Sequence, residues 1–350
     1  MTRPSATHSG LGSAQVMHQV VLATLPGVAA MIWYFGAGSL IQILLAGAAA
    51  LGAEALVWRL RRRPIRPGLS DGSALVTGVL LGIAMPPLAP WWLAVVGGCF
   101  AILIAKHPYG GLGANLFNPA MAAYAMLLVA FPDAMAHWPA PRPLLAEGAS
   151  WAGLPTAALA IFAPGTQSAD AFTMATPLAA FRDSSGLLVR QFWETHPLFV
   201  AGDLAAVGWE TVSLGFLLGG IYLVIRGLVG WQAPVAMLAT IWLLAVMFGD
   251  GGSSASRGPP ALHLLSGATL FGAFFIVTDP VSLAASPRGR LLCGALAGAL
   301  TFAIRAWGGY PDGLAFAVLL TNLCVPLIDR CTIPQPPGQA PRRWLRGPEP

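Results

Sequence analysis

Two threonines and an acid stand close together in a segment that separates two groups of apolar stretches. Asp170 is followed by Thr173 and Thr176, with Ala175 directly before the second hydroxyl. A hydroxyl can be esterified, but no His or Lys that would act as its base occurs between residues 138 and 195. A Thr or Asp ahead of an apolar stretch is also a common helix N-cap. The spacing alone therefore leaves a modified hydroxyl and a helix cap as alternatives.

Two amides stand near a glycine-rich run in the first half of the chain. Asn115 and Asn118 follow the glycines of residues 110–113. Amides offer donors and acceptors to the edge of a heterocycle, and glycines let the backbone approach a planar ring. Alternatively, the two amides cap a helix that begins at Pro119, a residue suited to a first helical position. Both interpretations stay open from the residues alone.

Four acids, Glu54 among them, lie close to apolar stretches, where an ionisable group is a candidate for function. Asp279 lies between Thr278 and Pro280 at the end of a stretch, and it could serve a cofactor or a coupling ion. Asp71 and Asp312 each precede a glycine, and we expect them to cap helices at the membrane surface.

Several kinds of site are excluded by residue type and spacing. The four cysteines form no CxxC pair and the six histidines are dispersed, so we expect no metal or haem held by this chain alone. No Rossmann glycine fingerprint is present. The basic residues are scattered between apolar runs without an aromatic-interleaved patch, and we expect no nucleic-acid partner.

The composition indicates what must position these residues. Only 9% of the 350 residues are charged and 56% are hydrophobic, whereas a soluble domain is roughly 25% charged. So few charges cannot cover so much apolar surface in water, and disordered chains have the opposite composition. The sequence therefore predicts an all-α polytopic membrane protein.

Charge-free stretches predict about ten transmembrane helices. The first pair spans about 19–36 and 39–58, with a break at residues 35–38, and a proline-rich break at 85–90 separates the next two. With ten spans, 14 of the 19 basic residues fall on the side that holds both termini, which makes that side cytoplasmic. The predicted organisation is a cytoplasmic segment 1–18, a first repeat 19–132, an extracytoplasmic segment 133–210, a second repeat 211–330 and a cytoplasmic tail 331–350, which is expected to be disordered and to contact anionic lipid.

Two of the stretches look short for helices that face lipid. Residues 72–85 and 313–328 predict broken helices that line a protein-buried cavity, or else tilted helices in a locally thinned bilayer. A faint repeat supports the first interpretation, because small residues and a proline recur 194 positions apart: Ala74, Gly78 and Pro86 against Ala268, Gly272 and Pro280. Five helices between the copies would invert the second one, which predicts a 5+5 inverted repeat.

A resemblance to a known family adds to these predictions. The motif Asp170-x-x-Thr173-x-Ala175-Thr176 resembles the sequence at which a flavin transferase esterifies FMN phosphate onto a threonine. From about residue 15 to 335 the chain resembles the D-type membrane component of the Rnf (Rsx) electron transport complexes. That family is related to the B-type component of the sodium-pumping NADH:quinone oxidoreductase. The further stretches that carry the resemblance are residues 70–78, 106–120, 272–281 and 309–317, with Asn322 downstream.

The resemblance implies two flavins. Thr176 matches the threonine that carries covalent FMN through a phosphoester, and Asp170, Thr173 and Ala175 complete the attachment motif. Met174 departs from the pattern, since many members have a smaller residue there. Non-covalent riboflavin toward the cytoplasmic side is implied near Asn115 and Asn118, with Asp279 as a further candidate contact.

The resemblance also implies a setting for the chain. It implies a multi-pass protein of the bacterial inner membrane, with the Thr176 loop on the periplasmic side. The partners would be Rnf subunits of the A, B, C, E and G types and a flavin transferase, and electron transfer would be coupled to Na⁺ or H⁺ translocation. A channel or secondary transporter with no redox cofactor fits the broken helices and the inverted repeat equally well, and covalent flavin on Thr176 would separate the two.

Overall fold

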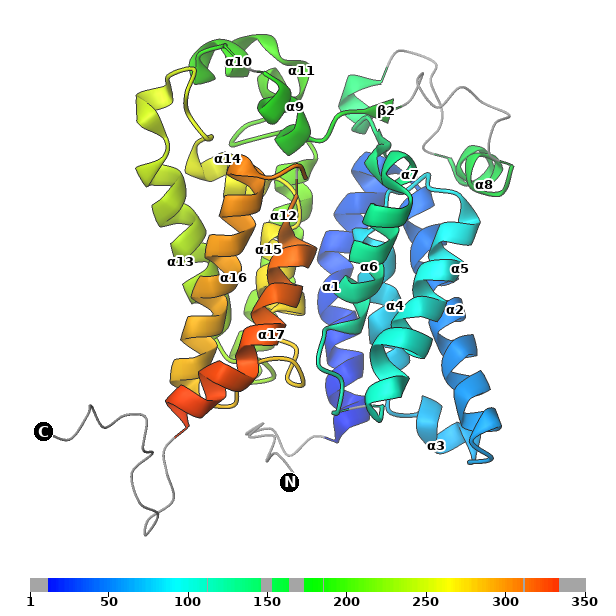
Figure 1. Ribbon diagram of the computed structural model, residues 1–350. Coiled ribbons are helices and arrows are strands. Elements are labelled where there is room, and N and C mark those ends of the chain that lie inside the picture. Colours follow the sequence, from blue (N-terminus) through cyan, green and yellow to red (C-terminus); the bar gives the residue numbers. More distant parts are fainter. Residues whose placement is uncertain are drawn as a thin grey trace, which may run out of the picture.

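The computed structural model describes residues 12–111, 113–145, 153–163, 173–184, 186–310 and 312–333. Within these residues the chain is almost entirely helical, and its long helices run roughly parallel to one another in one bundle (Figure 1). We call the slab that these helices span from end to end the layer. The start of α1 and the end of α17 lie at the same face of this layer. The short elements between the two halves of the chain lie at the opposite face. Asp170 lies outside the described residues.

Five segments cross the layer in the first half of the chain. The predicted break at residues 35–38 is confirmed, and Gly36 makes it possible with a φ of 82°, a conformation that glycine adopts without strain. Short α3 (Ile65–Leu69) and the turn η2 (His107–Tyr109) lie at the face where α1 starts. The crossing segments are α1 (Ser13–Phe35), α2 (Gly38–Leu60), α4 (Ser73–Ala84), α5 (Trp91–Phe100) continued by η1 (Ala101–Lys106), and α6 (Pro119–Ala130).

Five further segments cross the layer in the second half. They are α12 (Trp209–Ile225), α13 (Gln232–Met247), the broken segment α14 (Pro260–Leu265), α15 (Thr269–Phe271) and η6 (Gly272–Ile276), then α16 (Pro287–Trp307) and α17 (Leu314–Thr332). The short turn η5 (Asp250–Gly252) follows α13. The prediction that residues 313–328 form a short span is wrong. Helix α17 continues past Asp329, because this carboxylate is buried and accepts a hydrogen bond from the Ala285 backbone N–H at 2.8 Å.

The segment between the halves carries the short elements of the opposite face. They are α7 (Pro132–Ala136), β1 (Trp138–Pro139), η3 (Arg142–Leu144), α8 (Leu154–Phe162), β2 (Thr173–Met174), α9 (Pro177–Asp183), α10 (Val189–Thr195) and α11 (Pro197–Val200). Strands β1 and β2 pair in antiparallel fashion, with Trp138 opposite Met174. This pairing ties the Thr176 segment to the end of the first half.

The helices have the length and surface of membrane spans. Among the described residues, five helices are long and apolar enough to cross a bilayer, and four shorter apolar helices of 10–17 residues accompany them. Large apolar side chains such as Leu44, Leu218 and Met247 are more than 60% exposed, as expected for a surface that faces lipid. The protein is therefore a helical polytopic membrane protein, as the composition predicts.

The two halves meet through small residues. Helix α1 packs against α12, and α6 packs against α17. A Cβ added to Gly219 of α12 would collide with the Ala23 carbonyl oxygen of α1, so only glycine permits this approach. The first segments of the two halves thus pack against each other, and so do the fifth segments. This pairing is expected of two repeats that are related by a two-fold axis. Both alanines of the sequence repeat lie in the third segment of their half, Ala74 in the first turn of α4 and Ala268 at the N-cap of α15.

Candidate functional site

Thr176 lies at the start of α9, where the chain leaves β2. Its Oγ1 accepts a hydrogen bond from the Ala179 backbone N–H at 3.3 Å, and Pro177 occupies the first helical position. The helix-cap interpretation is therefore confirmed for Thr176. The cap uses a lone pair of Oγ1, so it leaves the hydroxyl proton free to donate or to be replaced. The side chain is half-buried.

The rest of the described motif is held in an extended form. Thr173 lies in β2, paired with Pro139 of β1. Ala175 is exposed and, together with Thr176, lines a cavity. The strand pairing therefore presents Thr176 at the junction between the short elements and the layer of long helices.

This cavity has a volume of about 480 Å³ and is enclosed by both halves of the chain. Ring contacts stiffen its wall, since Trp209 stands 5.0 Å from both Phe35 and Trp138, measured between ring centroids. A mostly apolar cavity of this size is typical of a cofactor or small-molecule site. Its large apolar and aromatic lining residues are Met31, Phe35, Met121, Tyr124, Leu128, Met135, Trp138, Trp209, Phe216, Phe271 and Tyr310.

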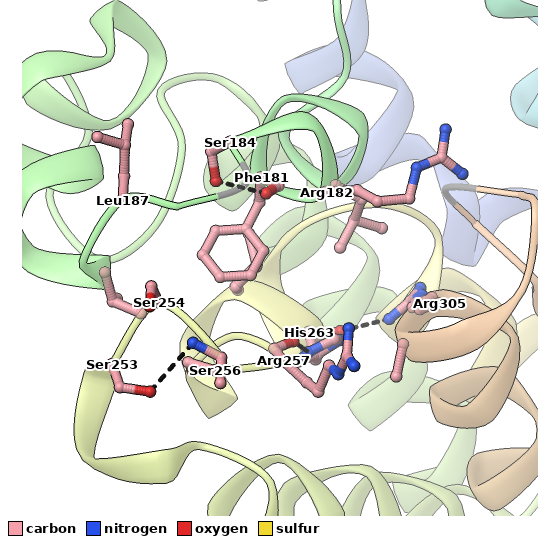
Figure 2. Close-up of a pocket in the computed structure, with 15 residues that line it drawn as sticks. Phe181, Arg182, Ser184, Leu187, Ser253, Ser254, Ser256, Arg257, His263 and Arg305 are labelled. Carbon is pink, nitrogen blue, oxygen red and sulfur yellow. Dashed lines mark hydrogen bonds between the residues drawn. The ribbon is translucent and has the colours of Figure 1, made fainter.

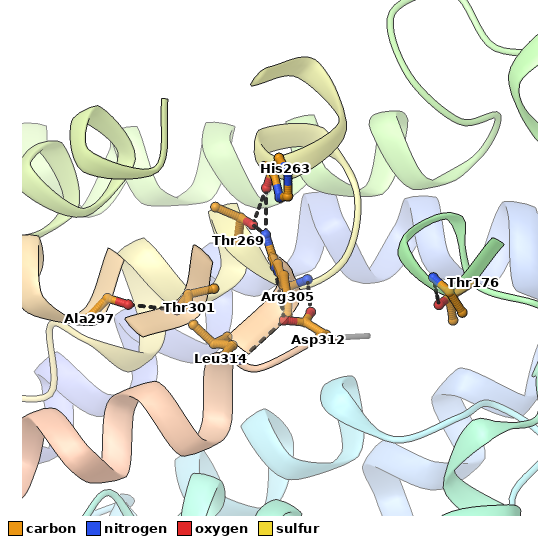
Figure 3. Close-up of polar contacts among 10 residues, drawn as sticks. Thr176, His263, Thr269, Ala297, Thr301, Arg305, Asp312 and Leu314 are labelled. Atoms are coloured by element: carbon orange, nitrogen blue, oxygen red, sulfur yellow. Dashed lines mark hydrogen bonds and ion pairs between the residues drawn. The ribbon is translucent and has the colours of Figure 1, made fainter. Parts of the chain in front are cut away.

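An ion pair between buried Arg305 and half-buried Asp312 lies at the edge of the cavity (Figure 3). Asp312, which lines the cavity, accepts a hydrogen bond from Arg305 Nη2 at 2.9 Å and further ones from the Ala268 and Leu314 backbone N–H groups. Burial raises the pKa of the Asp312 carboxyl, but Arg305 and the N–H donors outweigh it and hold that pKa below its ordinary value. The carboxylate is therefore charged, and it caps α17 as predicted.

Arg305 was not among the candidates from the sequence. Its Nη1 also donates to the His263 carbonyl and to Thr269 Oγ1, both at 2.9 Å, so one guanidinium joins α14, α15 and α16. A signal was present, because Arg305 is the only charged residue between 291 and 311. A second cation, Arg182 of α9, lines the same cavity as Thr176 and donates to the Gly309 carbonyl at 2.7 Å.

A second buried ion pair lies near the start of α4, at the other face. Lys106 Nζ is 2.7 Å from Glu54 Oε2 and donates to Ser73 Oγ at 2.8 Å. Asp71 accepts hydrogen bonds from both the backbone N–H and the hydroxyl of Ser73, at 2.8 and 2.6 Å. The expectation that Asp71 caps a helix is thereby confirmed.

Three candidate site residues from the sequence remain, Asn115, Asn118 and Asp279, and the structure links the last two. Asn118 Oδ1 accepts from the Met121 backbone N–H at 3.1 Å and caps α6, while the Asn118 backbone N–H donates to Asn322 Oδ1. Asn322 donates to the Ser282 carbonyl, and Ser282 Oγ donates to Asp279 Oδ2 at 2.9 Å. A chain of hydrogen bonds thus joins Asn118 to Asp279 across α17.

Asn115 has a different local role. It does not cap α6, and its Nδ2 donates to the Phe117 carbonyl at 2.9 Å. Neither Asn115 nor Asn118 lines the cavity at Thr176, but Met121 does. Met121, and with it one wall of that cavity, lies three residues along α6 from Asn118, about 4.5 Å of helical rise. Of the described residues, no group of three or more His, Cys, Asp or Glu is arranged to hold a metal.

Comparison with known proteins gives a consistent result. The profile of the NQR2, RnfD, RnfE family matches residues 1–338. The chain is 49% identical over 340 residues to the D component of the ion-translocating oxidoreductase complex of Aeromonas salmonicida, covering 94% of this chain and 95% of that protein. It is 47% identical to the protein of the same name from Cellvibrio japonicus, over 95% of this chain and 93% of that one. The corresponding Escherichia coli O6:H1 protein is 46% identical, with 94% and 95% covered.

Proposed function

The chain belongs to the NQR2, RnfD, RnfE family, and from this premise we propose that it is the membrane subunit of an ion-translocating electron transport complex of the Rnf type. In this role the protein relays electrons between FMN held covalently on Thr176 and a second flavin, riboflavin. Electron passage is coupled to movement of Na⁺ or H⁺ across the inner membrane. Flavins supply the redox chemistry, and the protein supplies binding, orientation and electrostatics.

One observation carries the proposal. A threonine hydroxyl with a free proton lines a cavity of about 480 Å³ between the two halves. The aromatic and methionine side chains of this cavity suit a planar, largely apolar ring, and they exclude water from it. Arg182 on the same wall provides a cation for a phosphoester of Thr176. In the proposal, Asp170, Thr173 and Ala175 form the rest of the motif that a flavin transferase reads.

The second flavin is proposed near Asn118 and Asp279. The Oδ1 of Asn118 accepts the hydrogen bond that caps α6. Its Nδ2 has no hydrogen-bond partner among the described residues and can donate to a heterocycle. The Oδ1 of Asn115 is likewise available as an acceptor. The short path along α6 from the Thr176 cavity to Asn118 keeps the two proposed sites close, as electron transfer requires.

The proposed orientation follows the positive-inside rule. The face that holds the start of α1 and the end of α17 is cytoplasmic, and the face of α7 to α11 with Thr176 is periplasmic, where a soluble transferase can reach it. The proposed partners are the A, B, C, E and G types of Rnf subunit. This assignment rests on the relatives, which are named as the D component of an ion-translocating oxidoreductase complex.

The test is in-gel fluorescence of the full chain, purified from a host that expresses the flavin transferase and then denatured. Covalent flavin survives denaturation, so the wild-type band should fluoresce under ultraviolet light and its intact mass should include one FMN. Thr176→Val should abolish both signals with the protein still present. Thr195→Val is the matched control, because it removes an exposed hydroxyl of α10 that lies outside the attachment motif and should retain the fluorescence.

Expression without the transferase should also give a dark band. A dark wild-type band from a competent host, or fluorescence that persists in the Thr176→Val variant, would refute the covalent-flavin proposal. A flavin-free wild-type chain would instead favour a channel or secondary transporter built on the same inverted repeat.

A further inference from the structure

A short segment at the end of α2 concentrates positive charge. Five of the eight residues 59–66 are arginine, and all five are exposed: Arg59, Arg61, Arg62, Arg63 and Arg66. No acid occurs between residues 55 and 70, and the buried carboxylate of Glu54 is already paired with Lys106 at 2.7 Å. Residues 59–66, which we call the arginine segment, therefore have no counter-charge of their own.

The arginines at the opposite face are different, because each has a partner within the protein. The partner is a carboxylate, a backbone carbonyl or an aromatic ring, and the contacts are Arg305 with Asp312 (2.9 Å), Arg190 with Glu194 (2.7 Å), Arg182 with the Gly309 carbonyl (2.7 Å), Arg142 with the Trp33 ring (4.9 Å) and Arg257 with the Trp307 ring (5.9 Å). Figure 2 shows three of these arginines, Arg182, Arg257 and Arg305, around a pocket beside α9. By contrast, four guanidiniums of the arginine segment have no such partner among the described residues: Arg59, Arg62, Arg63 and Arg66.

The arginine segment is held in a defined position. Arg61 Nη2 donates a hydrogen bond to the His107 carbonyl of η2 at 3.0 Å. Helix α3 lies against the end of α2, and a Cβ added to Gly68 of α3 would collide with the Trp58 indole of α2. The four guanidiniums without a partner therefore belong to a folded turn that is fixed at both of its ends.

Arg62 provides an independent sign that these side chains have a role. Its φ of 53° lies in the left-handed region, one residue beyond the C-cap of α2, where glycine is the usual residue. The turn closes with a hydrogen bond from the Arg63 backbone N–H to the Trp58 carbonyl at 3.0 Å. An arginine at this position costs backbone strain that glycine would avoid. Strain of this kind points to a function for the side chain that the fold alone does not require.

The neighbouring apolar side chains indicate that the segment lies at a membrane surface. Leu60 is 72% exposed and Ile65 is 37% exposed, and both stand between arginines. Helix α2 has 23 residues and is therefore about 35 Å long, so its end reaches the headgroup region of a bilayer whose apolar core is about 30 Å thick. Guanidiniums beside exposed apolar side chains at this level are typical of a segment that contacts phosphates and acyl chains together.

We propose that the arginine segment binds an anionic phospholipid at the face where α1 starts. The phosphate oxygens accept hydrogen bonds from the guanidiniums that have no partner among the described residues, and Leu60 and Ile65 contact the acyl chains. A dissolved phosphate would supply the negative charge but no apolar chain. The inference rests on the membrane-spanning fold and is independent of the proposed flavins.

The test measures lipid binding by native mass spectrometry, with the full chain purified free of lipid in an uncharged detergent. The probes are phosphatidylglycerol, which carries a net negative charge, and phosphatidylethanolamine, whose ammonium group balances its phosphate. We expect the first phosphatidylglycerol to bind at least tenfold more tightly than the first phosphatidylethanolamine. Equal affinities would overturn the proposal and would leave an acidic protein surface as the partner of the arginines.

Two double variants attribute the binding to the arginine segment. Arg62→Gln with Arg63→Gln should lower the affinity for phosphatidylglycerol at least tenfold, because each arginine near an anionic surface contributes about fivefold. Arg62→Lys with Arg63→Lys keeps both charges and should retain most of the affinity, which separates the charge from damage to the turn. Both side chains are exposed, so folding should be retained, which size-exclusion chromatography checks.

A third double variant is the matched control. Arg226→Gln with Arg288→Gln removes the same charge from two exposed arginines of the same face, at the end of α12 and the start of α16, and should leave the affinity nearly unchanged. An equal loss in this control would mean that the total charge of the face attracts the lipid, which would contradict the proposal. Full binding by the glutamine pair at 62 and 63, or lost binding by the lysine pair, would contradict it as well.

Discussion

Single residues in this protein serve the fold and the proposed chemistry at once. Thr176 caps α9 with one lone pair and keeps its proton, and Asn118 caps α6 with its oxygen and keeps its amino group. A cap and a ligand contact are therefore not exclusive alternatives at either position. Substitutions that remove the whole side chain cannot separate the two roles, whereas substitutions that keep the capping oxygen can.

Asn118→Ser is the variant that separates them. Serine caps a helix about as well as asparagine, so the thermal stability should stay close to wild type, whereas Asn118→Ala should cost about 1 kcal/mol. Because serine lacks the Nδ2 donor, non-covalent riboflavin measured after extraction should fall, and the in-gel fluorescence of the covalent flavin should remain. Undiminished riboflavin in Asn118→Ser would return the residue to a capping role alone.

The Arg305–Asp312 pair should behave as a coupled unit. Arg305 is only 1% exposed in its side chain, so Asp312→Asn leaves a buried guanidinium without its counter-charge, at a cost of about 3–5 kcal/mol. The double variant Arg305→Met with Asp312→Leu removes both charges and should recover much of that loss. Thermal unfolding of the single variants Arg305→Met and Asp312→Leu and of the double variant measures the coupling. Strictly additive losses would show that the pair is not an interacting unit.

The sequence predicts the local helix caps but not the contacts between distant residues. The caps at Thr176, Asp71 and Asp312 follow from local spacing, because a capping side chain bonds a backbone group two or three residues away. The Asn118–Asn322 contact joins residues 204 positions apart. Such a contact depends on how α6 and α17 pack, and no local pattern reports it.

At the scale of the helices, the third segment of each half is held by the same kind of contact, a hydrogen bond from a cationic side chain to a hydroxyl. Lys106 at the end of η1 donates to Ser73 at the start of α4, and Arg305 near the end of α16 donates to Thr269 at the start of α15. In both cases a cation from the fourth segment donates to a hydroxyl of the third one, at the start of α4 in the first half and at the start of α15 in the second. The pairing repeats at opposite ends of the layer, as an inverted repeat requires. The small-residue repeat in the sequence points to the same third segments, but it does not predict these hydrogen bonds between a cation and a hydroxyl.

The contact between α1 and α12 should tolerate no side chain at its closest point. Gly219→Val places a Cβ against the Ala23 carbonyl, which cannot move out of the way, and should destabilise by about 1–3 kcal/mol or more. Gly52→Val is the matched control, because a Cβ on Gly52 of α2 meets nothing within 4 Å and the helix-propensity cost is the same. Fluorescence-detected size exclusion after heating should show a lower midpoint for Gly219→Val only. Equal midpoints for the two variants would mean that the helices can separate without cost.

For the whole molecule, composition and charge predict the number of spans and their direction, but not the cavity. The cavity lining draws on residues from Met31 to Ala315. Residues so far apart become neighbours only through the pairing of the two halves. Thr176 could therefore be found as a motif by resemblance, while the space beside it, with Arg182 and Asp312 on its wall, required the fold.

The direction of the chain in the membrane can be tested with single cysteines. Cys331 is exposed at the end of α17, on the proposed cytoplasmic face, and Arg190 is an exposed residue of α10 on the opposite face. Replacing Cys99, Cys293 and Cys324 by alanine leaves Cys331 as the one cysteine. In spheroplasts of this variant, a membrane-impermeant maleimide should leave Cys331 unlabelled until the membrane is permeabilised. In the same background with Cys331→Ser, Arg190→Cys should be labelled without permeabilisation, because the proposed periplasmic face is open to the reagent. The reverse pattern would place Thr176 in the cytoplasm, out of reach of a periplasmic transferase, and would contradict the proposed route of flavin attachment.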